Sequence, residues 1–150
     1  MRISLAYLFL VSALSFPACA SSLREKIPDE QTLASLEQRA ALAPAKDECY
    51  LYAELAHEMV EYGARQYASG GVEKATKMLK QTQQVTRKIR MILGGNAHKL
   101  KEAQILLRRT AFRLTELLHA SSYEDRPLVQ ETLAELNAAE NDTMMQLFKK

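Results

Sequence analysis

Apolar residues recur along most of the chain three or four positions apart, which is the spacing of one face of an α-helix. Four such stretches, separated by turn-forming residues, cover 29–43, 47–69, 72–119 and 125–148. No stretch alternates between apolar and polar residues as a half-buried strand does. The sequence therefore predicts an all-α fold.

The first two stretches differ in strength. Residues 29–43 carry few apolar side chains and predict a short, loosely docked helix. Residues 47–69 begin at Asp47, a residue type that caps helix N-termini, and end before Gly70-Gly71. One face of this second helix carries bulky side chains and is expected to be buried; these are Leu51, Leu55, Met59 and Tyr62.

The third stretch keeps one seven-residue repeat over its whole length. One row holds Leu79, Thr86, Leu93, Leu100, Leu107 and Leu114; the row three residues on holds Thr82, Ile89, Asn96, Ala103, Thr110 and Leu117. The phase does not change across Gly94-Gly95, although two glycines are typical of a helix end. Since two helical glycines cost only about 2 kcal/mol relative to alanine, we predict one long central helix over 72–119 with flanking antiparallel helices. The alternative is a compact four-helix bundle broken at Gly94-Gly95.

The last helix is expected to begin at Asp125, with Pro127 in its first turn, where a missing N–H costs nothing. Its predicted apolar face consists of Leu128, Thr132, Leu136, Ala139, Met144, Leu147 and Phe148.

Charge is unevenly spread, although the net charge is only +2. Residues 72–115 are strongly basic, whereas 29–69 and 116–150 are acidic overall. This pattern is complementary within one chain, so we expect the second and last helices to fold back on the two halves of the central helix. Apolar residues outside the two rows, including Ile105 and Phe112, give the central helix a further apolar side that a homodimer could bury.

The first twenty residues have the layout of a secretory signal peptide. Arg2 gives a positive start, residues 5–16 form an apolar stretch too short to span a bilayer, and small residues precede a cut between Ala20 and Ser21. A lipoprotein that keeps Cys19 in acylated form is the alternative. The expected organisation is therefore a signal peptide (1–20), a polar leader with a short helix (21–46) and a helical domain (47–150). The mature chain is expected to be periplasmic or secreted and to have no membrane span.

Two Glu-x-x-His motifs, Glu54/His57 and Glu116/His119, have the spacing with which helical bundles hold two metal ions. On helical wheels these four side chains avoid the apolar faces, whereas ligands in such a centre project inward. We therefore interpret them as solvated side chains and expect no metal and no other cofactor, with a small metal-binding bundle as an alternative.

The central helix carries many basic residues, among them Lys80, Arg87, Lys101 and Arg108. They could bind an anionic surface weakly, or they could pair with the acidic helices, and the compensating acidic charge favours pairing. No aromatic residues interleave with them to stack on bases, so no nucleic-acid partner is expected.

Signal cleavage would leave one cysteine, Cys49, near the start of the second helix. A helix N-terminus lowers the pKa of a thiol, but Asp47 and Glu48 oppose that effect. We interpret Cys49 as a small packing residue, with a disulfide to a second chain as the alternative. No nucleophile–base spacing, phosphate loop or Cys-x-x-Cys pair is found, so no enzymatic activity is expected.

Residues 59–79 resemble one tetratricopeptide-type helical hairpin. The residues that carry the resemblance are the small and apolar Gly63, Gly70, Ala75 and Leu79, although Met59 stands where the repeat usually has Trp. The resemblance covers about one repeat and implies a role in protein contacts. Residues 27–31 are distantly similar to a signature of small periplasmic helical chaperones, and the remainder resembles exported helical proteins of bacteria.

Together these patterns favour an exported, non-enzymatic protein-interaction or assembly module that binds a protein partner or a second copy of itself. A periplasmic holdase-like chaperone is the alternative from the same amphipathic surface.

Overall fold

The computed structural model describes residues 28–94 and 98–149, and within them it contains five α-helices and no strand. The helices are α1 (Glu30–Ala41), α2 (Ala45–Ala68), α3 (Val72–Ile92), α4 (Leu100–Ala120) and α5 (Arg126–Leu147). The predicted all-α class is confirmed. The predicted signal peptide and its cut between Ala20 and Ser21 lie outside the described residues.

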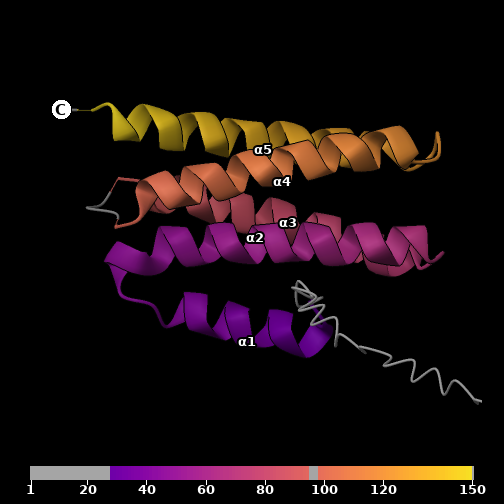
Figure 1. The fold of residues 1–150 in the computed structure, drawn as a ribbon, viewed down its shortest axis with the longest axis horizontal. Coiled ribbons are helices and arrows are strands. Elements are labelled where there is room, and N and C mark those ends of the chain that lie inside the picture. The colour runs from indigo at the N-terminus through magenta and orange to yellow at the C-terminus, as the bar shows by residue number, and fades with distance from the viewer. Residues whose placement is uncertain (1–27, 95–97, 150) are drawn as a thin grey trace, which may run out of the picture.

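Four of the helices form a closed bundle. α2 packs on α3 and α4, and α5 packs on the same two helices. α2 and α3 make one antiparallel hairpin and α4 and α5 make a second, and the two hairpins lie against each other (Figure 1). α3 and α4 therefore occupy opposite corners of the bundle and do not pack on each other.

The prediction of one long helix over 72–119 is wrong. α3 ends at Ile92, α4 begins at Leu100, and the two helices run in opposite directions (Figure 1). Lys99, directly before α4, has a φ of 56°, a left-handed conformation that a continuing α-helix of L-residues does not contain. The observed architecture is the alternative, a compact four-helix bundle, with α1 added on the outside.

Burial explains why the seven-residue phase survives the break. Ile89 of α3 and Leu107 and Leu114 of α4 are all fully buried in the same core, so each helix needs its own apolar face whether or not the backbone is continuous. Folding back buries both rows at once. Each fully buried leucine or isoleucine is worth about 1.5–3 kcal/mol, whereas each helical hydrogen bond lost at the break is worth about 1 kcal/mol.

The bundle interior is lined largely by small and branched side chains. Five threonines are fully buried, namely Thr82, Thr86, Thr110, Thr132 and Thr143. Each donates its hydroxyl proton to the carbonyl oxygen four residues earlier in its own helix, at 2.7–2.8 Å. A buried hydroxyl without a partner would be costly, and these bonds allow the helices to pack closely without that cost.

Most of the bulky stripe of α2 is buried, as expected, but largely by α1 and outside the four-helix interior, and Leu51 is only partly buried. Leu33 of α1 lines a groove together with Met59 and Tyr62, and Leu55 beside them is completely covered. The residues of α2 that reach the four-helix interior are smaller: Cys49, Ala53, Ala56 and Val60. The helix begins at Ala45 and not at Asp47, with Pro44 in the N-cap position.

α1 packs on α2, and side chains of α3 also reach it. One polar cluster fastens its first turn: Glu30 Oε1 accepts hydrogen bonds from Tyr62 Oη at 2.8 Å and from Lys74 Nζ at 3.0 Å. These two donors lower the pKa of Glu30. The first helix is short, as expected, but its buried Leu33, Leu36 and Ala40 show that it is not loosely docked.

We expect Glu30→Gln to lower the melting temperature at neutral pH. Because the pKa of Glu30 is lower in the folded chain, its contribution is complete above the ordinary carboxyl range and is lost as the pH falls through the folded pKa. The difference in melting temperature between the wild type and Glu30→Gln should therefore shrink toward zero on acidification. Glu37→Gln, on the same groove, is the matched control, and an equal effect of the two substitutions would contradict the assignment.

A second polar cluster joins the two hairpins near the C-terminal end of α2. Tyr67 Oη donates to Asp125 Oδ2 at 3.0 Å and accepts from the Ser122 backbone N–H at 2.7 Å. Ser122 Oγ also donates to Asp125 Oδ2 at 2.7 Å. Asp125 precedes α5 as expected, but its side chain serves this cluster and does not cap the helix.

Tyr67→Phe is expected to reduce the free energy of unfolding by about 1–3 kcal/mol, because it removes one partner from each of two hydrogen bonds in a partly buried cluster. Urea unfolding of the two proteins measures the difference. Tyr123→Phe is the control, since the Tyr123 side chain is largely exposed. A loss of stability in the control as large as that in Tyr67→Phe would show that the cluster is not its cause.

The expected charge complementarity is confirmed by the ion pairs between the described helices. Each joins a basic residue of α3 or α4 to an acidic residue of α1, α2 or α5: Lys74–Glu30, Arg87–Glu135, Lys88–Glu48, Arg90–Asp142, Arg108–Glu140 and Arg113–Glu61. Most of these side chains are at least partly exposed, and such pairs contribute about 0–1 kcal/mol each. These ion pairs therefore help to select which helices lie together, but they add little to the free energy of unfolding. None of the described helices is both long and apolar enough to cross a membrane.

Candidate binding surface on α4 and α5

The outer face of α4 combines apolar and basic side chains. Lys101, Ile105, Arg108 and Phe112 follow one another at four-, three- and four-residue steps, so they share one side of the helix. The buried leucines of α4 lie on its opposite side. The exposed fraction is 39% for Ile105 and 67% for Phe112, although both are large hydrophobic residues.

The end of α5 extends this face into a groove. Because α4 and α5 are antiparallel, the last turn of α5 lies beside the first turns of α4 (Figure 1). The groove has a volume of about 480 Å³, and its lining consists of Lys101, Gln104, Arg108, Met144, Leu147 and Phe148. We call these six residues, together with Ile105 and Phe112, the α4/α5 patch.

The sequence pattern had assigned Leu147 and Phe148 to the buried face of the last helix, and the structure corrects this. Phe148 is 79% exposed and Leu147 is 38% exposed. These side chains are exposed because they lie where α5 ends. The last turn of α5 lies beside the first turns of α4, and Phe148 lies just beyond the helix end at Leu147.

The rim of the groove is cationic. Arg108 Nη2 lies 3.2 Å from Glu140 Oε1, and Gln104 Nε2 donates to the same oxygen at 2.6 Å. Lys101 is exposed and pairs with no acidic side chain among the described residues. The floor, formed by Met144, Leu147 and Phe148, is apolar, so the groove suits an apolar group next to negative charge.

The basic residues singled out in the sequence do not form one surface. Lys80 and Arg87 belong to α3, whereas Lys101 and Arg108 belong to α4, at the opposite corner of the bundle. Arg87 Nε is bound to Glu135 Oε1 at 3.2 Å. Arg87 has exposed Met91 one turn away on α3, whereas the α4 pair lies beside several apolar side chains and lines a groove.

The two Glu-x-x-His motifs do not converge. Glu54 lines a groove beside α1, and Glu116 Oε2 accepts a hydrogen bond from Arg113 Nη1 at 2.9 Å. His119 is exposed near the end of α4. Among residues 28–94 and 98–149, no group of three or more His, Cys, Asp or Glu side chains is arranged to hold a metal ion.

His57 is not the solvated side chain that its wheel position predicts, because it lies half-buried between α2 and α4. Its Nδ1 is 3.0 Å from Thr110 Oγ1, and the Thr110 hydroxyl already donates its one proton to the Leu106 carbonyl. Thr110 must therefore accept, which places the His57 proton on Nδ1. The neighbouring Arg113 Nε lies 3.3 Å from Glu61 Oε2 but is poorly aligned for a hydrogen bond, so that contact is electrostatic.

Cys49 lies in the core with 1% of its surface exposed. Burial, and secondly the charge of Glu48, raises the pKa of its thiol to about 11. The thiol is therefore protonated and weakly nucleophilic at neutral pH. This placement fits the interpretation of Cys49 as a packing residue, and a disulfide to a second chain would require the bundle to open.

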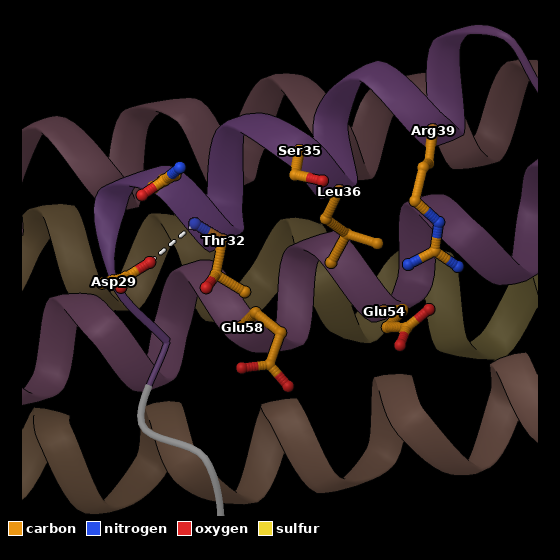
Figure 2. A pocket seen from close by; sticks show the side chains of 8 residues that line it. Asp29, Thr32, Ser35, Leu36, Arg39, Glu54 and Glu58 are labelled. Carbon is orange, nitrogen blue, oxygen red and sulfur yellow. Dashed lines mark hydrogen bonds between the residues drawn. The ribbon is translucent and has the colours of Figure 1, made fainter.

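A larger groove, with a volume of about 630 Å³, lies along the junction of α1 and α2. Figure 2 shows that α1 contributes Thr32, Ser35 and Arg39 to it and that α2 contributes Glu54 and Glu58. Asp29 accepts the backbone N–H of Thr32 at 2.7 Å and caps α1 (Figure 2). The walls of this larger groove are polar and carry both positive and negative side chains. It therefore favours one class of ligand less clearly than the α4/α5 groove does.

Comparison of the chain with protein-family models, curated proteins and solved structures finds no match. The resemblance of residues 59–79 to a tetratricopeptide-type hairpin stays a prediction. α2 and α3 do form an antiparallel hairpin there, and Gly63 allows their close approach, since a Cβ at Gly63 would lie 3.3 Å from the Met78 Cβ.

Proposed function

We propose that this protein is an exported, non-enzymatic interaction module that binds a protein partner through the α4/α5 patch. Export rests on the signal-peptide layout of residues 1–20. The observation that carries the proposal is the exposure of two aromatic side chains, Phe148 at the edge of a cation-rimmed apolar groove and Phe112 farther along the same face of α4.

The composition of the patch supports a protein partner. Aromatic residues, methionine and arginine are enriched in protein interfaces relative to the rest of the surface, and the patch contains all three. Apart from Phe148, which directly follows α5, its residues project from two packed helices, so little conformational entropy is lost when they are covered. Exposed aromatic anchors on one face, one of them at the edge of a groove, are also the arrangement from which binding hot spots are built.

Site-specific photocrosslinking tests the proposal. A photoreactive phenylalanine derivative at position 112, in the full chain expressed in its native cells, is expected to yield one adduct of defined mass. The adduct should disappear when the wild-type protein is present in excess and should persist when Phe112→Asp is in excess.

The same photoreactive residue at Met91 is the matched control, because Met91 is 74% exposed but lies on α3, at the opposite corner of the bundle. Equal adducts from both positions, or many adducts of different masses at position 112, would point to non-selective binding of the kind a holdase shows. No adduct at position 112 would overturn the proposal.

A further inference from the structure

We propose that the partner is a second copy of this chain, bound antiparallel along α4, with Phe112 of each copy inserted into the α4/α5 groove of the other. This inference rests on the proposed function and specifies the occupant of the same patch.

The first argument is the placement of Phe112 relative to the groove. Phe112 projects from the second half of the outer face of α4, whereas the groove opens beside the first half, next to Lys101 and Arg108. Phe112 therefore does not line this groove in its own chain, and the aromatic residue that does line it is Phe148, at its edge. A two-fold axis across α4 places each anchor at the other copy's groove, which is the reciprocal contact that an isologous dimer requires.

The second argument is that two independent pairings share one axis. An antiparallel arrangement that places Ile105 against the second copy's Phe112 also places Lys101 against the second copy's Glu116. Both pairs are centred between positions 108 and 109, so a single two-fold axis satisfies both. Glu116 lies on the same side of α4, four residues after Phe112, and its side chain is 48% exposed. Its Oε2 accepts a hydrogen bond from Arg113 of its own chain, so the second copy's Lys101 would share this carboxylate.

The third argument is charge balance along this axis. The first half of the face carries Lys101 and Arg108, and the second half carries Glu116, so antiparallel copies bring opposite charges together whereas parallel copies do not. Arg108 lies close to the axis but is already bound to Glu140 of its own chain. In this register Arg108 faces the second copy's Arg109 on each side of the axis, a like-charge pair that weakens the interface, so we expect a reversible dimer of modest affinity.

The arrangement is tested first by the mass of the protein in solution. Sedimentation of the chain from Ser21 onward is expected to show a monomer at about 1 µM and a rising share of dimer toward several hundred micromolar, the range of a weak interface. Phe112→Asp should weaken the dimer at least tenfold, as the loss of an anchoring side chain does. Met91→Asp, an exposed apolar residue on α3, should leave it unchanged.

A charge exchange tests the register. Lys101→Glu should weaken the dimer, because it opposes the second copy's Glu116, and Lys101→Glu combined with Glu116→Lys should restore it. Folding is monitored in parallel by helical circular dichroism. Failure of the double variant to recover, with the fold intact, would overturn this register.

Cysteine crosslinking gives a covalent readout. Positions 101 and 116 are about 22 Å apart along one helix at 1.5 Å per residue, too far for a disulfide within the chain. Lys101→Cys with Glu116→Cys should therefore give a disulfide-linked dimer under oxidation at about 100 µM, and neither single variant should. The buried Cys49 does not compete.

A wild-type chain that remains monomeric at several hundred micromolar, together with no crosslink in the double-cysteine variant, would overturn the dimer. If photocrosslinking at position 112 nevertheless captures a different protein, the proposed interaction function stands and only its assignment to a second copy fails. If both experiments are negative, the patch is not an interface.

Discussion

Leu114→Ala is expected to lower the free energy of unfolding by about 2–5 kcal/mol, the range measured for leucine-to-alanine changes that leave a cavity in a packed core. Leu114 is completely buried on the inner side of α4. Because α4 contributes to a core closed by α2 and α5, its neighbours cannot collapse freely into the space. Urea or thermal unfolding of the wild type and the variant measures the difference.

Phe112→Ala is the control for this prediction. It removes a larger side chain from the same helix, two residues away, but one that is 67% exposed. In a monomer the expected change is within about 0.5 kcal/mol, as for most surface substitutions. If Phe112→Ala destabilised the dilute protein as strongly as Leu114→Ala, the assignment of inner and outer faces of α4 would be wrong.

Ala56→Leu should also be strongly destabilising, by about 1–3 kcal/mol or more, because overpacking a tight core forces side chains and backbone apart. Ala56 is completely buried on the face of α2 that meets the four-helix interior. Alanine and leucine both favour helices, so the substitution changes the apolar volume at this position and little else. A loss of stability would therefore be caused by packing.

Ala134→Leu is the matched control, since Ala134 is exposed in the middle of α5. We expect little change in its unfolding free energy. An Ala56→Leu variant as stable as the wild type would show that α2 does not present this face to the interior.

The face of α2 also shows what the sequence could reveal and what it could not. Periodicity located the helix and its bulky stripe, because Leu, Met and Tyr give a strong apolar signal. It could not show that α1 covers that stripe, nor that alanines and a cysteine form the inner face, because alanine is common on exposed and on buried helix faces alike. Tertiary packing, not local pattern, made that choice.

The central prediction failed for a related reason. A constant seven-residue phase across Gly94-Gly95 is compatible with one helix or with two helices that bury equivalent rows in the same core. The choice depends on how many apolar faces each arrangement buries, which is a property of the whole chain. The charge pattern correctly indicated that basic helices lie against acidic ones, but it did not show that α2 and α5 each pack on both α3 and α4. Ion pairs such as Arg87–Glu135 and Arg113–Glu61 join helices that the pattern had not paired.

The candidate surface could be predicted in part. Ile105 and Phe112 fall outside the two buried rows, so the sequence marks them as exposed apolar residues. Phe148 and Leu147 fit an apolar face by spacing, and only the position of the α5 end relative to α4 shows that they line an open groove. His57 was misplaced because its wheel position says nothing about the threonine that faces it from α4.

The chain reverses direction between α3 and α4. Because of this reversal, one face of α4 packs in the core and the opposite, outer face is exposed. Spin labels at Glu73→Cys and His119→Cys, in protein diluted with unlabelled chain, measure the reversal directly. Both positions are exposed, Glu73 in the first turn of α3 and His119 in the last turn of α4. These two helix ends lie at the same end of the bundle (Figure 1), so we predict a distance of about 25 Å, roughly two helix diameters. A distance near 70 Å, as expected for one continuous helix rising 1.5 Å per residue, would contradict the bundle and the dimer inferred from it.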